Sequence, residues 1–113
     1  MAAEPIVVLC ACPDEECAGR IARELVSARL AACVTRLSGA RSVYRWKEAL
    51  KDEPEVLLAI KTTRVRYAAL EMRLKALHPY EVPEIIALPV VAGAQDFLAW
   101  VEEETCPAPG TRE

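Results

Sequence analysis

Short apolar runs recur along the chain and predict four strands. Such runs occur at 6–12, 30–37 and 55–61, and a fourth, between Pro83 and Pro89, lies in the segment 82–91. Runs of this length, bounded by Pro, Gly or polar residues, are typical of buried strands. The segment 41–46 continues the second run past Ser38-Gly39, so we expect one long strand with a bend or bulge near Gly39. The polar residues 47–54 are expected to form the turn before the third strand.

Apolar residues spaced three and four apart predict three helices between and after these strands. Pro13 and the acids that follow it favour a helix start, and the spacing extends this helix over about 14–28. Thr62 or Thr63 is expected to cap the second helix, which Pro79 ends near His78. A short closing helix is predicted by one apolar face, made of Phe97, Trp100 and Val101.

The order β-α-β-β-α-β plus a terminal helix predicts an α+β fold of the ferredoxin-like type. Both helices would cover one face of an antiparallel sheet, which leaves the other face in need of a partner. The second and third strands are long enough for their hairpin to extend beyond its own domain. We therefore expect a single domain over 1–113, ordered over about 6–104, with a mobile tail at 105–113.

Composition narrows the class of protein. A chain of 113 residues with 53% apolar residues has more apolar surface than a small core hides, which favours a subunit interface. The net charge of -3 and the mixing of basic with acidic residues argue against a nucleic-acid partner. The apolar runs are too short to span a bilayer. An odd number of cysteines, five, without a signal-peptide pattern favours a reducing, cytoplasmic location.

The segment from His78 to Glu84 is the leading functional candidate. His78 is the only histidine, and it is either a surface or capping residue that bonds the last carbonyls of its helix or a metal ligand. Cys10 and Cys12 lie two apart on a predicted strand, so their side chains leave the same face. Two thiols and an imidazole suit copper or zinc, yet cysteine is also a common core residue, and packing is favoured for Cys12.

Other polar and aromatic residues offer a second candidate site. Tyr44 and Trp46 share a strand face, where they either pack across the hairpin or form the wall of a ligand cleft. Lys61 closes an apolar strand, and Glu81 and Glu84 flank Val82-Pro83. If these three side chains converge, they form an ion pair or the polar lip of a pocket; otherwise they are solvated charges at strand ends. The sequence contains no phosphate-binding glycine loop, Ser-His-Asp set or nucleophile elbow, so a non-catalytic protein is expected.

Several segments together resemble the divalent-cation-tolerance family, known as CutA, in order and spacing over about 6–104. They are Leu30-Ala31-Ala32-Cys33-Val34, Tyr44-Arg45-Trp46, Lys61-Thr62-Thr63, the segment His78 to Ile85, and Phe97-Leu98-Ala99-Trp100. The resemblance implies a homotrimer joined through long hairpins and a link to copper or other divalent ions. It also implies Cys10 and His78 as metal ligands, although Leu77 stands where copper-binding relatives can have a second histidine.

The resemblance carries a second hypothesis, since the family's trimers are similar to PII-type signalling trimers. In it, the chain is a regulatory module whose inter-subunit clefts bind a small metabolite or a partner protein. Trp46, Lys61, Tyr80 and Glu84 would then line each cleft.

Overall fold

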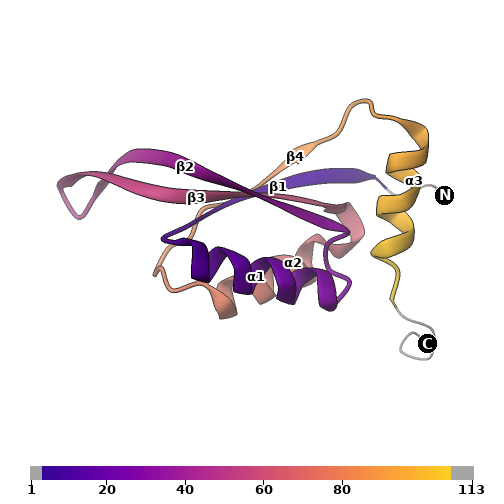
Figure 1. Cartoon of the computed structure of the whole chain (residues 1–113), viewed down its shortest axis with the longest axis horizontal. Coiled ribbons are helices and arrows are strands. Elements are labelled where there is room, and N and C mark those ends of the chain that lie inside the picture. Colours follow the sequence, from indigo (N-terminus) through magenta and orange to yellow (C-terminus); the bar gives the residue numbers. More distant parts are fainter. Residues whose placement is uncertain (1–3, 108–113) are drawn as a thin grey trace.

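The structure, a computed structural model of the chain, describes residues 4–107 and contains one four-stranded antiparallel sheet with three α-helices (Figure 1). The elements in chain order are β1 (Pro5–Cys12), α1 (Glu15–Ser27), β2 (Cys33–Trp46), β3 (Ala49–Thr63), η1 (Arg64–Arg66), α2 (Tyr67–Leu77), β4 (Ile85–Pro89) and α3 (Gln95–Glu104). The strand order is β2-β3-β1-β4, so β1 lies between β3 and β4. The predicted α+β class and the order of its elements are confirmed.

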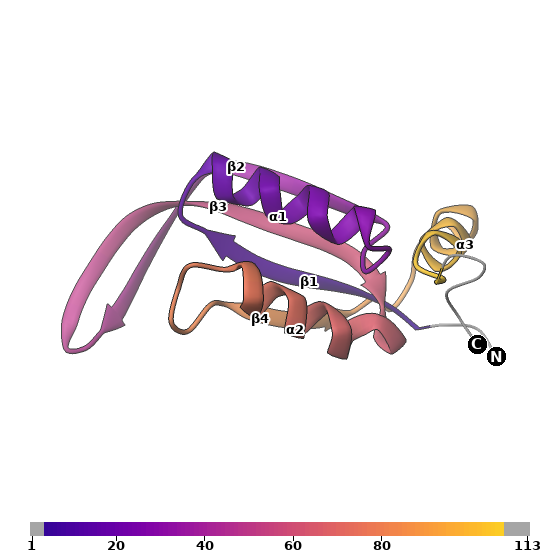
Figure 2. The same ribbon diagram turned by 90° about the horizontal axis from the view of Figure 1, so that it is seen from below.

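Helices α1 and α2 cover the same face of the sheet (Figures 1 and 2). Side chains on alternate strand positions point into this layer, and those fully removed from solvent include Val8, Leu58 and Ile60. They meet Ile21 and Leu25 of α1 as well as two leucines of α2, Leu70 and Leu74. Burial of apolar side chains is the main term that stabilises the fold, and here it fixes which face of β1 lies inside. No helix among residues 4–107 is long and apolar enough to cross a membrane.

The β2–β3 hairpin extends beyond the two helices that cover the sheet (Figure 2). Its register shifts between Leu37 and Ala40, and Gly39 has a φ of 86°, which confirms the irregularity predicted near Gly39. The turn is shorter than predicted. Only Lys47 and Glu48 separate the strands, both with positive φ, because residues from Ala49 onward already pair with β2. Pairing across the hairpin thus draws much of the polar segment 47–54 into β3.

The predicted helix starts are confirmed for α1 and wrong in detail for α2. Asp14 caps α1, since its side chain accepts a hydrogen bond from the Cys17 N–H at 2.8 Å. By contrast, Thr63 forms no capping bond, and the buried Thr62 hydroxyl donates to the Leu30 carbonyl at 2.7 Å. Thr62 therefore ties β3 to the segment before β2, and a 3₁₀ turn leads into α2.

The connection from α2 to β4 is longer than predicted. α2 ends at Leu77, and His78 is extended with ψ of 138°, as expected before Pro79. The fourth strand, expected over 82–91, covers only Ile85–Pro89, and it pairs with β1 alone. Pro83 has no N–H to donate to a neighbouring strand, which accounts for the late start. Residues 79–84 are consequently a loop beside the hairpin.

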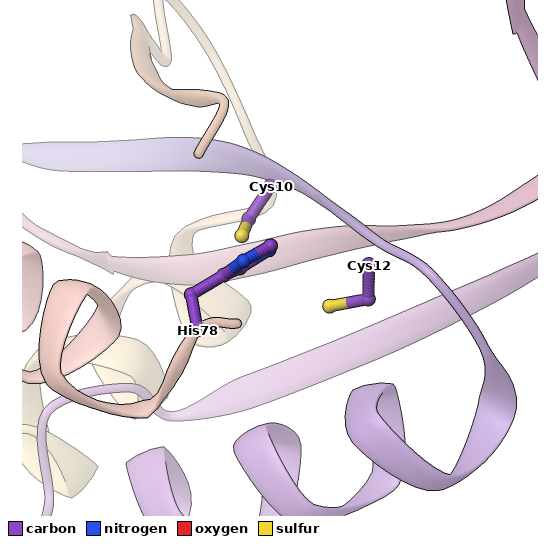
Figure 3. A group of neighbouring side chains, drawn as sticks. All are labelled: Cys10, Cys12 and His78. Carbon is purple, nitrogen blue, oxygen red and sulfur yellow. The ribbon is translucent and has the colours of Figure 1, made fainter. Parts of the chain in front are cut away.

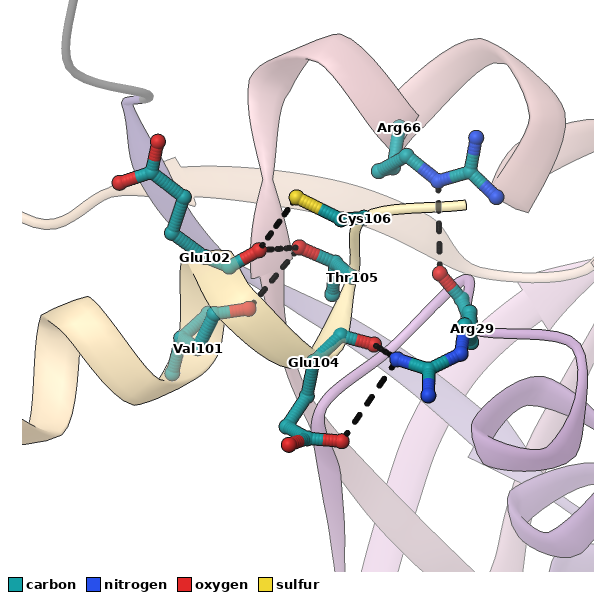
Figure 4. Close-up of polar contacts among 7 residues, drawn as sticks. All are labelled: Arg29, Arg66, Val101, Glu102, Glu104, Thr105 and Cys106. Carbon is teal, nitrogen blue, oxygen red and sulfur yellow. Dashed lines mark hydrogen bonds and ion pairs between the residues drawn. The ribbon is translucent and has the colours of Figure 1, made fainter. Parts of the chain in front are cut away.

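Helix α3 is held against the turn that follows α1 (Figure 4). Arg29, in the left-handed region with φ of 60°, donates to the Glu104 carbonyl at 3.2 Å, and its own carbonyl accepts from Arg66 at 3.3 Å. The predicted apolar face of α3 is only partly buried, because Val101 is buried while Phe97 and Trp100 remain exposed.

The tail predicted over 105–113 begins at Thr105. Thr105 is buried, and its hydroxyl donates to the Val101 carbonyl at 2.9 Å, so the packed structure continues past Glu104. Cys106 is exposed. Residues 108–113 lie outside the described part of the chain.

Candidate functional site

Cys10, Cys12 and His78 form a buried cluster between the sheet and α2. Their potential ligand atoms all lie within 4.8 Å of one another. Cys10 and Cys12 alternate with Ala11 on β1 and so leave its helix-covered face, while His78 follows the last residue of α2. Figure 3 shows both sulfur atoms pointing toward the imidazole. The structure therefore brings together the two predicted ligands, Cys10 and His78, and adds Cys12.

The imidazole of His78 is also a structural link. Its Nε2 atom lies 2.7 Å from the carbonyl oxygen of Ala11, and Nδ1 accepts a hydrogen bond from the Tyr80 N–H at 3.2 Å. These contacts assign the ring proton to Nε2, because Nδ1 is the acceptor. The expectation of a surface or capping histidine that bonds the last carbonyls of its own helix is therefore wrong, because the carbonyl belongs to β1 and the ring is buried.

The environment of the cluster shifts the protonation of its members. Burial lowers the pKa of His78, but the neighbouring Cys12 sulfur and the Ala11 carbonyl outweigh it and raise the pKa overall. The neighbouring Cys10 sulfur, together with burial, raises the pKa of the Cys12 thiol well above its ordinary value. At neutral pH Cys12 is consequently a thiol, and it must lose a proton before it can ligate a metal.

The donor set fits a soft metal ion. Two thiolate sulfurs and one imidazole are ligands that copper and zinc share, whereas calcium and magnesium prefer oxygen. Cys10 and Cys12 would supply the sulfurs, and His78 would supply a ring nitrogen. A bound ion there would neutralise the charge of the thiolates and would cross-link β1 to the end of α2.

Cys12 is the residue that sequence analysis assigned to packing. In the structure Cys12 is fully buried, and it also lies beside Cys10 and His78. The signal was the Cys-x-Cys spacing, which places both sulfurs on one face of a strand. Its third partner lies 66 positions further along the chain, where no local spacing rule applies.

A cleft lies between the β2–β3 hairpin and the loop 79–84. Figure 2 shows this loop as the segment that joins α2 to β4. Its volume is about 740 Å³. Three of the predicted cleft residues, Trp46, Tyr80 and Glu84, line it. Lys61 does not, because it lies toward the opposite end of β3, where its ammonium contacts Thr35 at 2.5 Å and the Cys33 sulfur at 3.9 Å. Within one chain, therefore, Lys61 and the other three residues do not form one site.

Two tyrosines bond glutamates at this end of the sheet. The Tyr80 hydroxyl donates to Glu55 at 2.8 Å, and the Tyr44 hydroxyl donates to Glu53 at 2.7 Å. Burial and the neighbouring Glu55 carboxylate raise the pKa of Tyr80, and the bond to Glu53 is the main cause that raises the pKa of Tyr44. Both phenols are therefore donors at neutral pH. Sequence analysis missed Glu55, whose position at the start of an apolar run resembles an ordinary strand-end charge.

A family model and two curated relatives that match this chain are all divalent-cation tolerance proteins. The model of the CutA1 divalent ion tolerance protein family matches residues 6–104. The divalent-cation tolerance protein CutA of Thermus thermophilus is 48% identical over 99 residues, which cover 88% of this chain and 96% of that protein. The corresponding protein of Pectobacterium atrosepticum is 46% identical over 98 residues, which cover 87% of this chain and 89% of its own length.

Solved structures agree in fold over the same region. The Thermus thermophilus protein superposes with a TM-score of 0.88 at 47% identity, covering 90% of this chain and 99% of that one. CutA1 from Oryza sativa gives a TM-score of 0.90 at 38% identity, with 95% and 98% covered. A protein from Archaeoglobus fulgidus described as periplasmic gives 0.86 at 31% identity, with 89% and 98% covered. On the extent of these matches, the chain belongs to the CutA1 divalent ion tolerance protein family.

Proposed function

We propose that this chain is a non-catalytic divalent-cation-tolerance protein that binds copper or another divalent metal ion through Cys10, Cys12 and His78. The observation that carries the proposal is the convergence of two sulfurs and an imidazole within 4.8 Å in a buried cluster. The names of the relatives, which refer to tolerance of divalent cations, support the same class of ligand.

Binding has a cost that the contacts of His78 and Cys12 define. Both ring nitrogens of His78 already form hydrogen bonds, so ligation through Nε2 gives up the bond to the Ala11 carbonyl. Each thiol that ligates releases a proton, and the raised pKa of Cys12 makes that release unfavourable at neutral pH. The site should therefore favour ions that bind thiolates strongly, with Cu(I) and Zn(II) ahead of harder divalent ions.

Competition titrations with a chromogenic chelator test this site, with Cu(I) under reducing conditions and with Zn(II). The exposed Cys106 also offers a thiol, so all proteins should carry Cys106→Ser. In that background we expect Cys10→Ser, Cys12→Ser and His78→Gln each to weaken metal binding at least about tenfold, as loss of one ligand does. Cys33→Ser is the matched control and should bind normally. Unchanged affinity in the Cys10→Ser, His78→Gln double variant would refute the assignment.

The proposal includes a ferredoxin-like subunit in a homotrimer joined through the long hairpins. The strand order β2-β3-β1-β4 with both helices on one face supports the first part. The sheet face opposite the helices supports the second, because Leu37, Ile86 and Leu88 on it are each about half exposed. A contiguous apolar face of this kind is unusual in a monomer and is typical of an interface.

Light scattering coupled to size-exclusion chromatography tests the assembly. We expect the mass of a trimer for the native chain and a smaller species for Leu88→Asp, since a charge cannot be buried unpaired in an apolar interface. Met72→Asp on α2 is the control, because Met72 is exposed on the helical side of the molecule. A monomeric native chain, or equal masses for both variants, would contradict the proposed interface.

We place the protein in the cytoplasm. All five cysteines are free thiols, and three of them are buried, which suits a reducing compartment. Fractionation of cells that express the full-length chain with an epitope tag tests the location. Recovery with periplasmic markers would overturn it.

A further inference from the structure

A basic notch lies on the helix-covered side of the sheet, between α1 and the edge strand β2 (Figure 2). One wall is a face of α1 with residues spaced three and four apart, namely Gly19, Ala22, Arg23, Val26 and Ser27. Val34 and Arg36, which alternate on β2, form the other wall. The notch has a volume of about 390 Å³, and it lies on the sheet face opposite to the proposed subunit interface.

Gly19 accounts for the way the two arginines of the notch come together. A glycine inside a helix usually weakens it, so one in the middle of α1 requires a structural reason. A Cβ atom at position 19 would lie 2.5 Å from Nη1 of Arg36 and 3.5 Å from Nη1 of Arg23. The Arg36 guanidinium therefore occupies the space that a side chain would fill, and it covers the backbone of the buried Gly19.

The two guanidinium groups concentrate positive charge without a counter-ion. Because both Nη1 atoms lie close to one point, they are no more than about 6 Å apart, a distance at which like charges repel. Within residues 4–107, neither Arg23 nor Arg36 forms an ion pair. Two acids of α1 have other partners, since Glu15 accepts from a serine hydroxyl of β2 and Glu24 pairs with an arginine of α2. An anion between the two arginines would replace their repulsion by attraction.

The chemistry of the notch favours a phosphate group over a carboxylate. A guanidinium presents a planar fork of N–H donors that matches the oxygens of either group. A phosphate monoester has close to two negative charges near neutral pH, enough for both arginines, whereas a carboxylate has one. The walls also include Ala22, Val26 and Val34, whose side chains are hydrocarbon, so the notch can hold a small apolar body beside the anion.

We infer that this notch binds a small organic phosphate. The phosphate group lies between the guanidinium groups of Arg23 and Arg36, and the apolar body lies against Ala22, Val26 and Val34. Both arginines are exposed, so salt competes for them and the affinity should fall as ionic strength rises. The inference goes beyond the proposed metal-binding function and does not depend on it, since it uses none of the three metal ligands.

Calorimetry with phenyl phosphate and benzoate, in a buffer free of phosphate, tests the inference. The two probes share an aromatic body and differ in the charge that would meet the arginines, and benzyl alcohol is the uncharged control. Metal is removed beforehand by dialysis against a chelator, so failure here is distinguishable from failure of the metal site. We expect phenyl phosphate to bind about fivefold more tightly than benzoate, which is what one further exposed charge pair supplies, and benzyl alcohol to bind more weakly than either.

Charge-removing variants locate the site. Arg23→Gln and Arg36→Gln should each weaken phenyl phosphate binding at least about fivefold, because each removes one of the two charged donors. Arg20→Gln is the matched control, since it removes the same charge from α1 at an exposed position outside the notch lining, and it should leave the affinity nearly unchanged. Equal binding of phenyl phosphate and benzoate, or equal binding by Arg36→Gln and Arg20→Gln, would overturn the inference.

Gly19→Ala separates binding from stability. Alanine is favoured inside a helix, so the midpoint of thermal unfolding should not fall. The new Cβ atom would displace the Arg36 guanidinium from the notch, and phenyl phosphate binding should therefore weaken. A Gly19→Ala variant that binds phenyl phosphate as tightly as the native chain would contradict the placement of the anion between the two arginines.

Discussion

Replacement of His78 should destabilise the protein even when no metal is present. The imidazole joins the end of α2 to β1, with Nε2 on the Ala11 carbonyl and Nδ1 on the Tyr80 N–H. In His78→Leu, the buried Ala11 carbonyl loses its partner, which costs about 1 to 3 kcal/mol, and the loss of the Tyr80 bond adds about 1 kcal/mol. The expected loss of unfolding free energy is therefore about 2 to 4 kcal/mol, a large share of the stability of a small domain.

Chemical denaturation with excess chelator measures this loss. His78→Gln is the matched control, because its amide N–H can still donate to the Ala11 carbonyl, and it should lose about half as much. All proteins must be compared at one subunit concentration, since assembly adds to apparent stability. A loss below about 1 kcal/mol for His78→Leu would refute the structural role. Such a result would leave metal binding as the reason for the buried histidine.

Three further predictions concern the hairpin, the core and the tyrosines. Glu48→Gly should raise the unfolding free energy by about 0.5 to 1 kcal/mol in denaturant titrations, because Glu48 has a φ of 67° that glycine adopts without strain. A lower stability would contradict the strained turn. Thr62→Val should cost about 1 to 3 kcal/mol by leaving the Leu30 carbonyl unpaired, whereas Thr35→Val at an exposed site should cost less than about 0.5 kcal/mol. Equal effects would show that the Thr62 bond is unimportant. Alkaline titration, followed by phenolate absorbance, should give later ionisation in the native than in the denatured protein, because the fold raises the pKa of every tyrosine, Tyr44, Tyr67 and Tyr80. Since the unfolded chain then loses protons first, stability should fall as pH rises above about 10, and coincident native and denatured curves would contradict this.

The periodicity of apolar residues was sufficient to predict most helices and strands. Each element buries one face in the core, and this burial sets the spacing of its apolar residues along the sequence. The run 6–12 became β1 (Pro5–Cys12), and the spacing over 14–28 became α1 (Glu15–Ser27). Gly39 marked the hairpin irregularity, since few other residues tolerate its φ. The errors lie at boundaries, where long-range pairing decides: partners across the hairpin extended β3 to Ala49, and the missing Pro83 donor shortened β4.

The candidate site was only partly predictable, because its residues come from segments far apart in the sequence. Alternation on a strand placed Cys10 and Cys12 on one face, but only the packing of α2 on β1 brings His78 to them. Glu55 joins Tyr80 across 25 positions, a distance over which no local period operates. Lys61 shares a strand with Glu55, yet it lies further along β3 and does not reach the cleft.

The irregular hairpin also bears on solubility. β2 lies at one edge of the sheet for all of its 14 residues, so its outer backbone groups have no partner strand within the described chain. An edge of that length is a template for unwanted strand addition and aggregation. The register shift between Leu37 and Ala40 divides it into two shorter stretches, and the exposed Arg36, Arg41 and Arg45 place charge along both. The same kink that shapes the hairpin thus restricts which strands can dock against its edge, and favours an ordered assembly over an open-ended fibre.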